Sequence, residues 1–154
     1  MPFAPPIPPL VLKTLDNPDG VDKSVYDGVI AAMRQDRPKF FATGVSLLLG
    51  TGAVSPEMSQ WAVSLFVQAS PKATIDLVRA FSETDFRPDM RAFTVPTLIV
   101  QGDADLVNPV ERSGRKRAQA IPGSQLTIYE GGPHGVFITH KDRFTRDLLG
   151  FVQS

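Results

Sequence analysis

At 154 residues with a formal net charge of zero, the chain has the length of one domain and no overall field that would attract nucleic acid or an anionic membrane. Hydrophobic residues make up 42% and charged residues 21%, which is typical of a globular protein and argues against disorder. Cysteine is absent and there are two histidines, so a disulfide framework and a thiolate or all-histidine structural zinc site are excluded.

The N-terminal segment is rich in proline, which occupies five of the first nine positions. Proline fixes φ and removes a backbone donor, so we expect an extended or polyproline-type segment and interpret residues 1–20 as a connection. The segment has neither the basic start of a signal peptide nor the apolar length of a membrane span. We therefore expect a cytoplasmic protein.

Residues 21–90 have the pattern of a helical region. Apolar residues recur at helical spacing between Val25 and Met33, which predicts a helix over residues 22–35. Three further helix starts are indicated where a polar capping residue precedes a proline in the first turn, at Pro38, Pro56 and Pro71.

The pattern changes in residues 91–154 to alternating strands and helices. An aliphatic run predicts a buried strand over residues 95–100, Pro109 opens a helix to about Ala120, residues 124–129 form a second strand, and a final amphipathic helix follows. The fold class is therefore α/β, with two parallel strands. Two strands leave edges whose backbone groups need partners, so they cannot form an independent sheet.

Two residues with catalytic potential follow the two predicted strands. Asp105 comes after the first, and His134 comes after the second within a glycine-rich turn. Sites in open α/β sheets form at the carboxyl ends of strands, so the carboxylate could orient the imidazole as a general base. Taken alone, each residue is more often structural, because aspartates cap turns and loop histidines are often exposed. Asp103 is the competing acid, although its place directly after Gly102 favours a role in the turn.

The stretch VPTLIVQGDAD at residues 95–105 and the later EGGPHG at residues 130–135 resemble the last third of α/β-hydrolases. Further matches at residues 8–20 and 80–86 resemble the cofactor-free, non-haem haloperoxidase and aryl-esterase branch. The resemblance implies a partial α/β-hydrolase fold, with a helical cap over residues 21–90 and the last two parallel strands and their helices in residues 91–154. It also implies hydrolysis of a small ester or its perhydrolysis with hydrogen peroxide, no metal or other cofactor, and triad roles for Asp105 as acid and His134 as base.

The family's serine nucleophile, on a Gly-x-Ser-x-Gly turn, is missing from these 154 residues. The nearest imitation, around Ser46, lacks the second glycine and lies in a predicted helix. The oxyanion-hole donors would also come from the missing part. Asn108 departs from the family's usual apolar residue and is expected to strengthen a helix cap.

Two interpretations of the chain follow. It is the C-terminal portion of a serine hydrolase acting on a small-molecule ester and completed by an absent half, or it is a truncated, non-catalytic remnant. The remnant would persist as an oligomerising or interaction module that pairs its open sheet edge and apolar helix faces with itself or with another chain. A third, weaker alternative is a metal held by Asp105 and His134 with Asp103 or His140.

Overall fold

A computed structural model describes residues 7–153, and the expected polyproline conformation of residues 1–6 lies outside them. The first part of the chain is helical. Four helices of equal length follow one another: α1 (Lys23–Gln35), α2 (Arg37–Leu49), α3 (Pro56–Gln68) and α4 (Pro71–Glu83). The predicted starts are confirmed, since the side chains of Asp36, Ser55 and Ser70 each accept a hydrogen bond from a backbone N–H in the first turn of the next helix.

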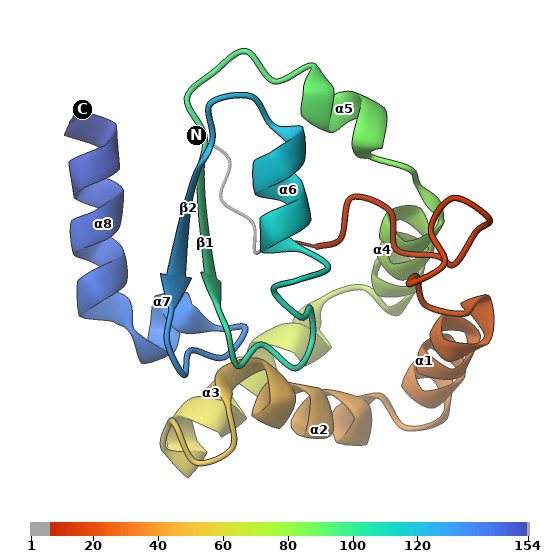
Figure 1. The fold of residues 1–154 in the computed structure, drawn as a ribbon. Coiled ribbons are helices and arrows are strands. Elements are labelled where there is room, and N and C mark those ends of the chain that lie inside the picture. Colours follow the sequence, from red (N-terminus) through yellow and green to blue (C-terminus); the bar gives the residue numbers. More distant parts are fainter. Residues whose placement is uncertain (1–6, 154) are drawn as a thin grey trace.

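The second part of the chain is a layered α/β unit. After the short α5 (Arg87–Arg91), the elements are β1 (Leu98–Gly102), α6 (Gly114–Ala120), β2 (Gln125–Tyr129), α7 (Val136–Thr139) and α8 (Lys141–Gln153). β1 and β2 are parallel, with Leu98 opposite Gln125 and Gly102 opposite Tyr129. α6 covers one face of this two-stranded sheet and α8 covers the other (Figure 1).

The helical region lies at the carboxyl end of the strands, where the arrowheads of β1 and β2 point toward α2 and α3 (Figure 1). Apolar side chains hold it together. One buried cluster joins Ile30, Met33 and Phe41, and a second joins Val45, Leu49 and Ala62 with Ile138 of α7 packed against it. The second cluster therefore connects the helical region to α7, the short helix that follows the loop after β2.

The expected order of strand, helix, strand, helix is present, but one helix starts later than predicted. The prediction placed the start at Pro109, whereas α6 begins at Gly114 and residues 109–113 form turns. The Ser113 hydroxyl lies 2.8 Å from the Pro109 carbonyl and 3.1 Å from the Asn108 carbonyl. Such local side-chain bonds compete with helical hydrogen bonds, so the turn persists and Asn108 is not the helix cap. Ser113 takes that position.

Within residues 7–153, none of the helices is both long enough and apolar enough to cross a membrane.

Candidate functional site

The loop after β1 holds the Asp105 carboxylate in a fixed orientation. Oδ1 of Asp105 accepts hydrogen bonds from the backbone N–H groups of Val107 at 2.9 Å and Asn108 at 2.8 Å. The side chain is 1% exposed. A carboxylate that is removed from water needs such donors, because an unpaired buried charge is costly. One oxygen is thus used by the loop itself, and the other is left for a different partner.

The second carboxylate oxygen, Oδ2 of Asp105, faces His134. Its Nδ1 lies 2.8 Å from Oδ2 of Asp105, and its side chain is 8% exposed. Nδ1–H can donate to the ionised carboxylate, which selects one tautomer and fixes the plane of the ring. This bond occupies Nδ1, so Nε2 is the ring nitrogen that can exchange a proton with a reacting group. The arrangement is chemically that of an oriented general base.

The two loops meet because glycine allows their backbones to touch. A Cβ on Gly102 would lie 1.8 Å from the Gly132 carbonyl oxygen, so no other residue fits without movement of the backbone. The backbone N–H of Ala104 donates to that same oxygen at 3.0 Å. Asp103 takes the turn role expected of it, because its Oδ1 accepts from the backbone N–H of Gly131 at 2.7 Å.

The helical region packs against the loop after β2 that carries His134. The Gly135 N–H donates to the Leu48 carbonyl at 2.7 Å, near the end of α2. Gly50, which follows α2, has a φ of +80°, and a Cβ there would touch the Pro133 ring. The position of His134 thus depends on α2 as well as on β2.

Gln101 of β1 lies against the Asp105 side chain. The sequence pattern marks it as the end of a strand and does not predict a role in the site. Gln101 is 2% exposed, and its Nε2 donates to Oδ2 of Asp105 at 3.1 Å. Its Oε1 accepts from the Gly114 N–H at 2.9 Å. A polar residue in an otherwise aliphatic strand, four positions before the acid, was the available signal.

The other candidate residues lie apart from this pair. Ser46 is exposed on α2, and its hydroxyl lies 3.4 Å from the Ala42 carbonyl of its own helix. His140 lies 2.8 Å from the Thr139 hydroxyl and packs edge-on against the ring of Tyr129. In the part of the chain that the structure describes, no cluster of three or more side chains suited to a metal ion is found.

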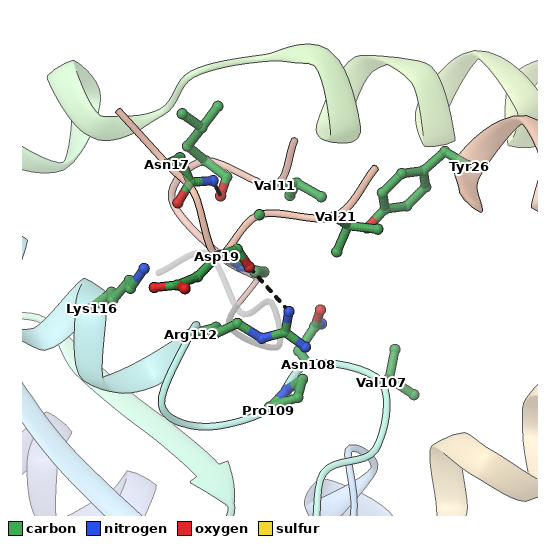
Figure 2. A pocket seen from close by; sticks show the side chains of 13 residues that line it. Val11, Asn17, Asp19, Val21, Tyr26, Val107, Asn108, Pro109, Arg112 and Lys116 are labelled. Carbon is green, nitrogen blue, oxygen red and sulfur yellow. Dashed lines mark hydrogen bonds between the residues drawn. The ribbon is translucent and has the colours of Figure 1, made fainter. Parts of the chain in front are cut away.

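A small cavity lies between the N-terminal segment and the residues that follow the acid (Figure 2). Asn108, Pro109 and Arg112 line it on one side, and the Arg112 guanidinium donates to the Asp19 carbonyl at 3.3 Å. Its volume is about 40 Å³, enough for a few water molecules and well below that of an ordinary small-molecule site. Asp105 and His134 do not line this cavity, so it is not where a substrate would meet them.

Known proteins share this fold and much of this sequence. No family model matches the chain. A Synechocystis protein described as a non-haem chloroperoxidase is 43% identical over 96% of the chain and 55% of its own length. A bifunctional esterase/perhydrolase of Acinetobacter calcoaceticus is 33% identical over the same share of each protein. A bromoperoxidase structure from Bacillus anthracis superposes with a TM-score of 0.89 at 36% identity, covering 96% of this chain and 55% of that one. The chain thus spans about half the length of these relatives.

Proposed function

Because the chain corresponds to the C-terminal half of α/β-hydrolases of the non-haem haloperoxidase type, we propose that it supplies the acid and the base of a serine hydrolase. Asp105 is the acid and His134 the base. In this proposal residues 21–90 form a cap and residues 91–154 the C-terminal part of the catalytic core. The observation that carries the proposal is the 2.8 Å contact between Nδ1 of His134 and Oδ2 of Asp105.

The serine is supplied by a segment outside these 154 residues, since the sequence contains no Gly-x-Ser-x-Gly turn. Nε2 of His134 removes the proton of that serine as its oxygen attacks the ester carbonyl. The histidine then returns the proton to the departing alcohol, and an acyl-serine remains. Water resolves the acyl-serine to a carboxylic acid, or hydrogen peroxide resolves it to a peracid. No step requires a metal or another cofactor.

The names of the relatives support this class of reaction, since one is an esterase/perhydrolase and others are haloperoxidases. A small-molecule ester is the proposed substrate. The acyl and alcohol groups depend on a pocket whose walls include the missing half.

The test compares two preparations in the hydrolysis of a short aryl ester. One is the 154-residue chain alone, and the other is the same chain combined with the N-terminal portion of the Synechocystis relative. We expect no activity from the chain alone. The combined preparation should hydrolyse the ester, and a phosphonate probe should label a serine in the added portion. His134→Ala should abolish both activity and labelling.

Two results would overturn the proposal. Labelling of a serine within the 154 residues, with activity that His134→Ala removes, would reveal a nucleophile in this chain. A combined preparation that is folded and stable but inactive would show that the Asp105 and His134 pair does not serve catalysis.

A second candidate function is that of a non-catalytic module that associates with itself. Within the described residues the sheet has two strands, so β1 and β2 each have one edge without a neighbouring strand. Apolar side chains are exposed around this unit, including Val95 at 61% and Leu106 at 75%. Light scattering on the purified chain tests this candidate. A dimer or larger assembly supports it, whereas a stable, folded monomer counts against it.

A further inference from the structure

We propose that Gln101 is the positioning residue of Asp105, holding the carboxylate at the angle that the histidine requires. This inference rests on the proposed function, because it concerns the same acid and base. Gln101 does not touch the reacting atoms. It acts through Asp105, and its effect reaches His134 by way of one shared oxygen.

The contact between the two side chains is direct. Nε2 of Gln101 lies 3.1 Å from Oδ2 of Asp105, the same oxygen that lies 2.8 Å from Nδ1 of His134. With the two backbone donors to Oδ1, the carboxylate receives four hydrogen bonds. Two donors on each oxygen fix its rotation about the Cβ–Cγ bond. Without Gln101, only the histidine itself would hold Oδ2.

Gln101 is in turn held from both sides. Oε1 accepts from the Gly114 N–H at 2.9 Å, and the Ser113 hydroxyl lies 3.0 Å from Oε1 and 2.8 Å from Nε2. Nε2 also donates to the Asn108 carbonyl. The Gln101 side chain is therefore held by the start of α6 and by Asn108 in the loop that carries Asp105. A group with so many partners has one orientation.

The chemistry of this place requires an amide. The carboxylate and the Asn108 carbonyl both need a donor, and the Gly114 N–H needs an acceptor, so the occupant must offer both. A carboxylate would face Oδ2 of Asp105 with a second negative charge. An apolar side chain would leave buried polar groups unpaired. Gly114 also admits the amide closely, since a Cβ there would lie 2.4 Å from Oε1 of Gln101.

The experiment reads the state of the His134 ring by NMR in the full 154-residue chain. Labelling with ¹⁵N-histidine gives signals from two residues, which a His140→Gln variant assigns. In the unmodified chain we expect the Nδ1–H tautomer and slow exchange of that proton with water. Gln101→Met, which keeps the volume, should speed the exchange about tenfold, the factor expected for losing one charge-assisted hydrogen bond.

A matched control separates positioning from stability. Asn17 is also a buried amide, at 9% exposure, and donates to the carbonyls of Leu10 and Leu12 away from the acid. Asn17→Leu should lower stability but leave the Nδ1 proton of His134 unchanged. Equal effects of Asn17→Leu and Gln101→Met on that proton would overturn the proposal.

Two further measurements keep the inference testable if Gln101→Met does not fold. Gln101→Glu retains an acceptor for the Gly114 N–H. At pH 8 it should speed exchange of the His134 Nδ1 proton as strongly as Gln101→Met does. In the unmodified chain, the Gln101 side-chain amide protons should exchange slowly with water. Rapid exchange of these amide protons, or a folded Gln101→Glu variant with an unaltered His134 ring, would contradict the inference.

The activity assay distinguishes this inference from the proposed function. In the combined preparation, Gln101→Met should lower kcat about tenfold or more while leaving KM nearly unchanged. If the combined preparation is inactive with every variant, but Gln101→Met still alters the His134 ring, the proposed function is refuted and the positioning role stands. Full activity of Gln101→Met would refute the positioning role alone.

Discussion

Substitution of Gly102 by alanine should separate the two loops that carry Asp105 and His134. The added Cβ would lie 1.8 Å from the carbonyl oxygen and 2.2 Å from the carbonyl carbon of Gly132. Carbon and oxygen atoms that are not bonded stay at least about 3 Å apart. The obstruction is backbone, which cannot rotate away as a side chain can. One loop must therefore move by roughly 1 Å.

The magnitude follows from what that movement breaks. Overpacking of this kind costs about 1–3 kcal/mol. The hydrogen bonds from the N–H of Asp103 to Tyr129 and from the N–H of Ala104 to Gly132 would lengthen as well, at about 1 kcal/mol each. We expect a loss of about 3 kcal/mol or more in the free energy of unfolding. For a chain of this length that lowers Tm by about 10 °C.

Chemical and thermal unfolding of the variant measure this loss, and Gly28→Ala is the matched control. Gly28 lies in α1, and among the described residues a Cβ there would meet no heavy atom within 4 Å beyond its chain neighbours and its own helix backbone. Alanine at this position should therefore stabilise the helix by about 0.5–1 kcal/mol. The same chemical change should thus have opposite signs at the two positions. A Gly102→Ala protein as stable as Gly28→Ala, with the His134 ring undisturbed, would refute the reasoning.

Three further predictions concern the acid, a buried phenol and a helix junction. Asp105→Asn should lower kcat of the combined preparation by about 10³–10⁴ while the chain stays folded, and activity within tenfold of the unmodified protein would contradict the triad role. Burial is the main cause that raises the pKa of Tyr129, and the hydrogen bond of its hydroxyl to Asp147 is the second. As pH rises above about 10, the unfolded chain therefore loses the phenolic proton before the folded chain does. Stability should therefore fall with pH in that range, and the fall should be shallower in Tyr129→Phe; parallel curves from denaturant titrations would argue against this. Arg37 donates to the Ala69 carbonyl and two other oxygens, so Arg37→Lys should cost about 1 kcal/mol, and unchanged urea midpoints would show that the junction does not need the guanidinium.

The sequence by itself determined the local structure and the nature of the candidate site. Proline after a capping serine predicted the starts of α3 and α4, because fixed φ and a side-chain acceptor both act within one turn. The aliphatic run before Gly102 predicted β1, although the strand begins at Leu98 and not at Val95. Asp105 and His134 could be selected because both follow strands, and parallel strands bring their carboxyl ends to one edge.

Tertiary structure alone decided how the pair is held. Gln101 is only four residues from Asp105, but its amide is held toward the acid by Ser113 and Gly114, which lie 12 and 13 residues further along the chain. The hydrogen bonds of the Ser113 hydroxyl to the Pro109 and Asn108 carbonyls delay α6, whose predicted start at Pro109 followed from propensity alone. Gly102 and Gly132 are far apart in the chain and meet only across neighbouring loops. Propensities describe a few consecutive residues, whereas these contacts depend on which distant groups the sheet brings together.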